Sequence, residues 1–283
     1  MSQPPPPDFD TLLAEALAHH QAGCLNDAVA IYETLLARQP DNAAAWINLG
    51  AARRSIGNTD EAVAALRRAV ALVPDHPGAQ FNLGNALVDS GDTDAACSAF
   101  EAAISQAPGM ADAYVSWGNV LMAAGRNDDA VAVLERGLEY STHHPGLLNN
   151  LGNALLGAHR VADALPYLEA AVDAAPTDRI AQRNLANALR LSGSLDEALK
   201  IFDALISTDP DDADTRCLRA FAHFSQAQFA DAWPDYSTRW KSAFHEASRP
   251  FRQPRWQGQD LVGKNLLVWG EQAVGDELMF ATM

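Results

Sequence analysis

The sequence predicts an all-α solenoid, a stack of helix pairs, and three series of residues with one shared period carry this prediction. The alanine series is Ala28, Ala62, Ala96, Ala130, Ala164, Ala198 and Ala232, each member 34 residues after the last. The proline series is Pro40, Pro74, Pro108, Pro176 and Pro210. The glycine series is Gly50, Gly84, Gly118 and Gly152. A period of this length is typical of repeats whose unit is one helix pair.

The composition favours helices and excludes several classes of partner. Hydrophobic residues make up 48% of the chain but aromatic residues only 7%, and much of the remainder is alanine, the strongest helix former. The net charge is −16, whereas a nucleic-acid-binding protein needs a cationic surface to displace counterions. The same acidic charge argues against docking on anionic membranes.

The sequence shows no features typical of an exported protein. Cys24, Cys97 and Cys217 are far apart in sequence, which argues against a disulfide framework and suits a reducing compartment. The first ten residues contain no basic and apolar signal segment, and no stretch is apolar enough to span a membrane. We therefore expect a cytoplasmic protein.

Each position of one repeat has a physical explanation. Gly50 and Ala62 are small, so they let the two helices of a pair approach closely. Leu66 fills the layer between neighbouring pairs. Gly57 is suited to the left-handed end of the first helix, and Asp or Thr after it is expected to cap the second helix. Proline then ends the second helix.

The spacing also resembles a known family. Trp46-x-x-Leu49-Gly50, followed by Ala62-x-x-x-Leu66 and Pro74, recurs as Tyr114-x-x-Trp117-Gly118 with Ala130-x-x-x-Leu134. This pattern resembles the tetratricopeptide repeat, which implies a right-handed superhelix whose first helices line a concave groove. Six copies are expected after a disordered, proline-rich segment at 1–8, namely 9–42, 43–76, 77–110, 111–144, 145–178 and 179–212. A degenerate seventh copy is expected at 213–246.

Asparagines recur at two positions of the first helices. They are Asn48, Asn82, Asn150 and Asn184 at the sixth position, and Asn85, Asn119, Asn153 and Asn187 at the ninth. Residues three apart share one face of a helix, so we expect two rows of amides along the groove. An amide both donates and accepts hydrogen bonds, which suits an extended peptide. The rows resemble the ladder of O-linked N-acetylglucosamine transferases, which holds acceptor polypeptides. The alternative is structural, with the amides bonding neighbouring helices.

Other chemistry finds little support. The second and fifth positions of the first helices lack the lysines of a carboxylate clamp. The histidines form no zinc motif, and no phosphate-binding loop occurs. His143 and His144 fall in a turn, and the acidic run at 209–214 reads as helix capping. We therefore expect no catalytic residue, no metal and no cofactor.

The character of the sequence changes after residue 212. Aromatic residues become frequent, and we expect Trp233, Tyr236, Trp240 and Trp256 to dock a following domain. Residues 247–264 contain two prolines and two glycines, so they are expected to form a linker. Residues 265–283 then predict a short β-strand, a glycine-bounded loop and the start of a helix, the opening of an α/β domain. The alternative is a capping strand and helix.

This ending resembles certain bacterial proteins. Ala232-Trp233-x-x-Tyr236-x-x-Arg239-Trp240, then Pro254-x-Trp256-x-Gly258 and Glu271-Gln272-x-x-Gly275-Asp276, are motifs of proteins that join these repeats to a glycosyltransferase-like domain related to heptosyltransferases. The resemblance implies a truncated Rossmann-like domain from residue 265. Its sugar-nucleotide loop would contain Gly270, Gly275 and Asp276.

Three functions follow as expectations. The first is an interaction module that binds an extended polypeptide in its groove and presents it as the acceptor to a glycosyltransferase domain. The second is an assembly scaffold that associates with itself. The third is an enzyme acting on a glycan, with the repeats serving location only. Whether the parent protein is an enzyme stays open, because the chain is expected to lack a complete catalytic domain.

Overall fold

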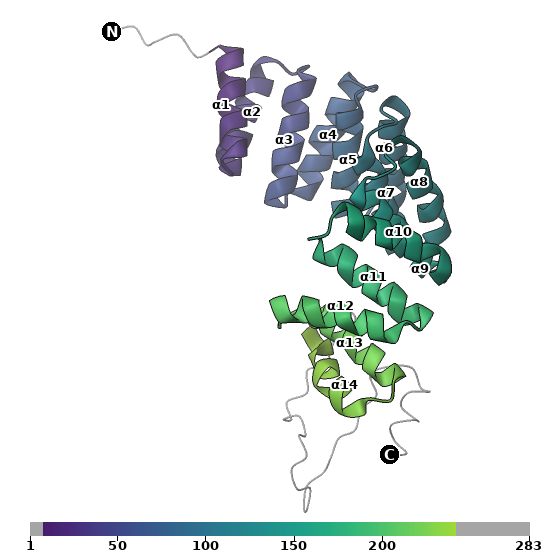
Figure 1. Cartoon of the computed structure of the whole chain (residues 1–283). Coiled ribbons are helices and arrows are strands. Elements are labelled where there is room, and N and C mark those ends of the chain that lie inside the picture. The colour runs from purple at the N-terminus through teal and green to yellow at the C-terminus, as the bar shows by residue number, and fades with distance from the viewer. Residues whose placement is uncertain (1–7, 242–283) are drawn as a thin grey trace, which may run out of the picture. The chain divides into compact units, whose positions relative to one another are not determined.

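The computed structural model describes residues 8–241, apart from the side chain of Trp240. This part of the chain forms fourteen α-helices and one short 3-10 helix, and it contains no strand (Figure 1). The all-α class is thereby confirmed for it. The predicted linker at 247–264 and the predicted strand, loop and helix at 265–283 lie outside the described residues. Among the described helices, none is both long and apolar enough to cross a membrane.

The helices form pairs that begin every 34 residues from residue 9. The first helices are α1 (Phe9–Gln21), α3 (Ala43–Ile56), α5 (Pro77–Asp89), α7 (Ala111–Ala123), α9 (Pro145–Gly157), α11 (Arg179–Ser192) and α13 (Ala213–Ser225). The second helices are α2 (Leu25–Arg38), α4 (Thr59–Leu72), α6 (Thr93–Gln106), α8 (Asn127–Tyr140), α10 (Val161–Ala174), α12 (Leu195–Thr208) and α14 (Phe229–Tyr236). The 3-10 helix η1 (Ser237–Lys241) follows α14.

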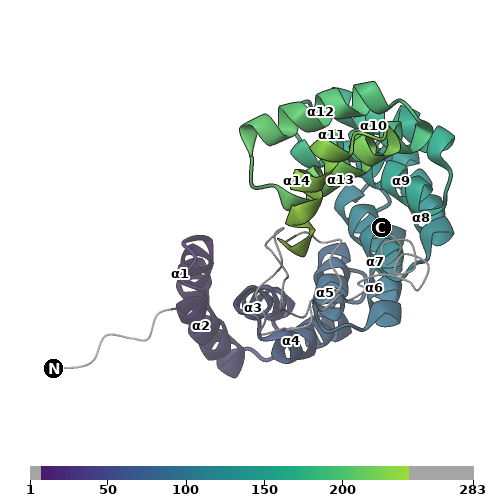
Figure 2. The same ribbon diagram turned by 90° about the horizontal axis from the view of Figure 1, so that it is seen from below.

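The chain divides into two compact units, residues 1–194 and 195–283. The division falls inside the sixth repeat, between α11 and α12. In the first unit, from α3 onward, the first helix of each pair contacts the first helix of the next, whereas successive second helices make no comparable contact. The first helices therefore line the inner side of a curved stack, as Figure 2 shows for α3, α5 and α7.

Glycine brings the two helices of a pair together, as the sequence predicts. A Cβ added at Gly84 would lie 2.6 Å from Phe100 Cε1, and one at Gly118 would lie 2.8 Å from Leu134 Cδ2. Gly50 and Gly152 meet Leu66 and Leu168 in the same way. The large residue sixteen positions later thus fills the space that a side chain would need.

The turn inside each pair has left-handed backbone at one fixed register position. Gly57, Gly91, Gly125 and Gly193 adopt φ of +89°, +80°, +73° and +92°, which agrees with their expected role as helix ends. His159 and Ala227 occupy the same register position and adopt φ of +60° and +59°. The repeat therefore imposes this conformation on His159 and Ala227, in which it causes steric strain.

The predicted capping of the second helices is confirmed at one helix and wrong at another. Asp92, directly after Gly91, caps α6, and its Oδ1 accepts from Ala95 N at 3.2 Å. Thr59 does not cap α4; the N-cap there is Asn58, which makes no side-chain cap bond. Side-chain caps occur mainly at the first helices instead. Asp8, expected to end the disordered segment, caps α1 through Thr11 N, and His144 Nδ1 accepts from Leu147 N at 3.3 Å. In the acidic run, Asp212 Oδ1 accepts from Thr215 N at 3.0 Å, which confirms its reading as a cap.

A second device joins successive pairs. The side chain at the fourth position of a first helix donates a hydrogen bond to the carbonyl of the proline that follows the preceding second helix. The pairs are Trp46 with Pro40, Gln80 with Pro74, Gln182 with Pro176 and Arg216 with Pro210, at 2.8, 3.2, 2.6 and 3.4 Å. Three different side chains perform this role, so the sequence period alone did not reveal it.

Candidate functional site

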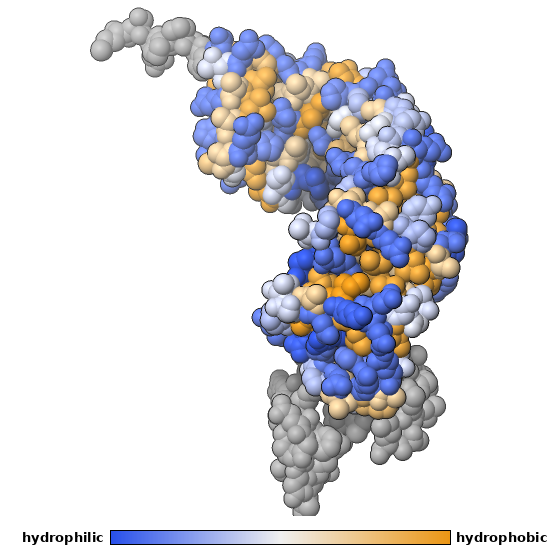
Figure 3. Space-filling view, in the orientation of Figure 1, coloured by the Kyte–Doolittle hydropathy of each residue, from blue (hydrophilic) through white to orange (hydrophobic). Residues whose placement is uncertain are grey.

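The candidate site is the inner face of the first unit, formed by the first helices α3, α5, α7, α9 and α11. The expected asparagines lie on these helices, where the curvature of the stack brings successive first helices together. Hydrophobic residues lie in patches between hydrophilic ones over the helices of this unit (Figure 3).

Part of the amide row forms one hydrogen-bonded chain. Asn184 Nδ2 donates to Asn149 Oδ1 at 2.9 Å, Asn149 Nδ2 donates to Asn150 Oδ1 at 3.2 Å, and Asn150 Nδ2 donates to Asn119 Oδ1 at 2.9 Å. The chain thus links α11, α9 and α7. Asn149 and Asn150 are buried, so their mutual bonds satisfy groups that water does not reach. These amides perform the structural role that the sequence analysis left as the alternative.

The remaining amides of the row are not used in this way. Asn48, Asn82, Asn85 and Asn153 are half-buried, and within the described part of the chain their side chains make no hydrogen bond. Hydrogen bonding therefore divides the asparagines of the two expected rows into two classes of amide. Those on α3 and α5 keep their full capacity to donate and accept.

Two arginines lie beside the row on α11. Arg190 donates to Asn187 Oδ1 from Nη2 at 2.8 Å, and burial lowers the pKa of its guanidinium. Arg183 is four residues from Asn187, so it shares that side of the helix. It occupies the fifth position, at which the sequence analysis looked for clamp lysines and missed this arginine. The α11 end of the inner face therefore carries two guanidinium groups.

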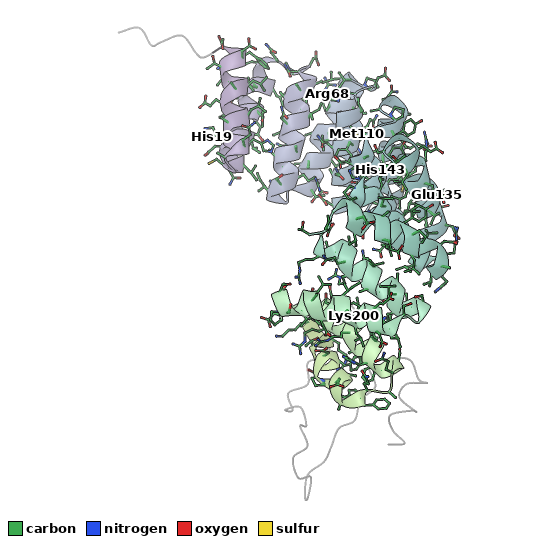
Figure 4. All side chains as sticks on the ribbon, in the orientation of Figure 1. His19, Arg68, Met110, Glu135, His143 and Lys200 are labelled. Atoms are coloured by element: carbon green, nitrogen blue, oxygen red, sulfur yellow. The ribbon has the colours of Figure 1, made fainter. Side chains whose placement is uncertain are left out.

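Three residues with metal-ligating side chains meet at the α1–α2 turn. His19, Cys24 and Asp27 place one ligand atom each within 4.8 Å of one another, and His19 is marked in Figure 4. Cys24 and Asp27 are exposed, and His19 Nδ1 lies 3.9 Å from Asp27 Oδ2. This exposed ion-pair geometry accounts for the cluster, so no metal centre is assigned to it.

The expected interdomain residues lie partly in the second unit. Trp233 and Tyr236 are on α14 and join an aromatic cluster with Phe224 of α13, their ring centroids 5.1 and 5.5 Å from that of Phe224. The side chain of Trp240 is not described, and Trp256 and the expected loop residues Gly270, Gly275 and Asp276 lie outside the described residues.

Comparisons with known proteins match the repeated part of the chain. Two family models, both described as tetratricopeptide repeat, match the chain, one at residues 13–77 and 149–213 and the other at 87–149. Together they cover more than half of the chain. Protein FlbA of Caulobacter vibrioides is 40% identical over 75 residues, which are 26% of this chain and 12% of FlbA. The chain thus spans about an eighth of the length of this curated relative.

Solved structures share the fold. A tetratricopeptide repeat protein from Parabacteroides merdae matches with a TM-score of 0.66 and 16% identity, covering 81% of this chain and 91% of that chain. YrrB, described as a TPR protein with an unusual peptide-binding site, matches with a TM-score of 0.51 and 24% identity, covering 62% of this chain and 91% of YrrB. At these identities the likeness concerns the fold alone.

Proposed function

The chain belongs to the tetratricopeptide repeat family, and we propose that it is a protein-interaction module that holds an extended polypeptide on its inner face. The observation that carries the proposal is the set of amides on α3 and α5. Asn48, Asn82 and Asn85 make no hydrogen bond within the described residues, although they are half-buried. A peptide backbone offers one donor and one acceptor per residue, so it can satisfy both groups of each amide.

The bonded amides support the same site indirectly. The chain from Asn119 to Asn184 ties α7, α9 and α11 together. It thereby fixes part of the inner face before a ligand arrives, which lowers the ordering cost of binding.

The test uses peptides selected on the full chain from a random display library. The triple variant Asn48→Ala/Asn82→Ala/Asn85→Ala should weaken binding by about 10- to 1,000-fold, since each net hydrogen bond contributes about 0.5–1.5 kcal/mol. The melting temperature should hardly change, because these amides make no hydrogen bond to any residue from 8 to 241. The matched control is Asn58→Ala, an exposed asparagine at the turn before α4.

Two results would contradict the proposal. One is unchanged affinity in the triple variant. The other is a bound peptide that keeps its affinity when its backbone nitrogens are methylated, because the proposed amides recognise backbone groups rather than side chains.

We also propose that the held polypeptide is an acceptor for glycosyl transfer in the cytoplasm. Its support is the motif set ending in Glu271-Gln272-x-x-Gly275-Asp276, which resembles glycosyltransferase-like proteins, and the cysteine usage. The experiment is affinity capture with the full chain from a cytoplasmic extract, followed by mass spectrometry of the captured polypeptides. Sugars on the captured polypeptides that are lost from the pool captured by the triple asparagine variant support this role, and captured polypeptides without any sugar would contradict it.

A further inference from the structure

The described end of the second unit presents a face of aromatic residues. We define this aromatic face as Phe224, Phe229, Trp233 and Tyr236. Phe224 is its centre, with ring centroids of the other three at 6.2, 5.1 and 5.5 Å. The contacts with Trp233 and Tyr236 are edge-to-face, an arrangement that aromatic pairs prefer. Phe229 is 56% exposed and Trp233 is 45% exposed, so the cluster is ordered by its own contacts while two large rings still meet solvent.

The repeat register shows what such positions do elsewhere in the chain. Trp233 stands at the register position of Val63 and Val131, which are 9% and 5% exposed. Val63 shares a buried cluster with Leu83 and Leu87 of α5, the first helix of the next pair. The position is therefore the one on which the following structural element packs.

The chain itself supplies the element that follows. The 3-10 helix η1 contacts both α13 and α14, and residues 242–283 continue directly from its end. The described chain therefore ends next to α13 and α14, the two helices that carry the aromatic face. The residues that follow, 242–264, are long enough to reach across that face, and they include Phe251 and Trp256.

Charge complementarity points to the same occupant. Residues 195–241 contain nine acidic and five basic residues, whereas residues 242–264 contain four basic and two acidic residues. Arginine side chains also suit an aromatic surface, as Arg239 shows by lying 4.4 Å from the ring centroid of Tyr236. We propose that residues 242–264 pack on the aromatic face.

Trypsin cleavage after Arg252 and Arg255 tests the proposal in the full chain. Cleavage of a docked segment follows the population of its open form, so we expect a rate at least about tenfold below that of a synthetic peptide of residues 245–262. The double variant Phe229→Ser/Trp233→Ser should abolish this protection. The matched control is Ile180→Ser/Leu191→Ser in the first unit, two residues with nearly the same exposure, 56% and 46%. The control should keep the protection.

Three outcomes would overturn the proposal. The first is equal cleavage of the chain and the peptide, a measurement that needs no variant to fold. The second is protection from trypsin that persists in the double variant. If the double variant loses its helical circular dichroism, the single variant Phe229→Ser is measured in its place. The third is protection that disappears on dilution together with a sedimenting dimer, because the occupant would then be a second copy of the chain.

Discussion

The two units place different chemistry at equivalent register positions. In the first unit, the Leu49 and Ala65 positions of successive pairs hold apolar residues such as Leu83 and Ala99, which lie in one buried cluster. In the second unit the same two positions hold Arg219 and Asp235. Arg219 Nε donates to Asp235 Oδ2 at 2.6 Å, and Arg216 Nε donates to Asp235 Oδ1 at 2.9 Å.

The charged residues that replace the apolar ones in the second unit are paired with one another. Asp235 is 2% exposed and bonds to two guanidinium groups. Burial by itself lowers the pKa of Arg219, but hydrogen bonds to Asp235 and Asp203 raise it overall. The difference between the units teaches that the register fixes where side chains meet, while the chemistry of the contact can change from apolar to ionic. The ionic contact needs both partners, so it tolerates change less well.

The largest effect is expected from Asp235→Ala, which restores the residue type of the first unit but leaves two guanidinium groups without their carboxylate. Removing one partner of a buried ion pair costs about 3–5 kcal/mol. Hydrogen exchange of α13 and α14 measures the loss, and the exposed Asp231→Ala is the control.

The double variant Asp235→Ala/Arg219→Leu sharpens the comparison, because it rebuilds the apolar contact of Leu83 and Ala99. It should recover part of the lost stability, since well-packed apolar residues often replace a buried ion pair without loss, while Arg216 still lacks the carboxylate of Asp235. If Asp235→Ala lowers the free energy of unfolding by less than about 1 kcal/mol, the ion pair contributes no more than an exposed one. It would then not stabilise the second unit as the apolar contact stabilises the first.

The next largest effect is expected where the two helices of a pair approach each other closely in the first unit. Gly84→Ala would place its Cβ 2.6 Å from Phe100 Cε1, and overpacking of this kind costs about 1–3 kcal/mol. Gly109→Ala is the control, because nothing lies within 4 Å of its added Cβ. Urea unfolding of both variants measures the difference. Equal midpoints would show that the pair of helices moves apart without penalty.

The repeat period predicted the helix pairs, the close approach at Gly84 and the left-handed turn at Gly57, because each depends on one small residue at a fixed register position. It could not predict the role of Asn149, whose equivalents Phe81 and Val115 are apolar. The Asp235 network was also missed, because only the folded helices bring its partners together. The left-handed backbone at His159 could have been found from its register position, although its residue type gave no sign.

A smaller effect separates the two classes of amide within the first unit. Asn150→Ala leaves the buried amide nitrogen of Asn149 without its acceptor and removes the bond to the exposed Asn119, which costs about 1–2 kcal/mol. Asn82→Ala should change stability by less than about 0.5 kcal/mol, as expected for a side chain that makes no hydrogen bond in the described part of the chain. Urea unfolding midpoints of the two variants measure this difference. If both variants lose the same stability, the division of the row is wrong.

The smallest effect concerns the turn that both units share. His159 in the first unit and Ala227 in the second hold left-handed backbone at φ of +60° and +59°, and both are exposed. Glycine removes the steric strain of this conformation but gives the unfolded chain more freedom. The net gain should be about 0.5–1 kcal/mol for Ala227→Gly and less for His159→Gly, because histidine tolerates this region better than alanine. Gly57→Ala, which introduces the strain at an unhindered site, should destabilise. Thermal unfolding followed by circular dichroism measures all three, and a loss of stability in Ala227→Gly would show that its turn is not under the strain that the register predicts.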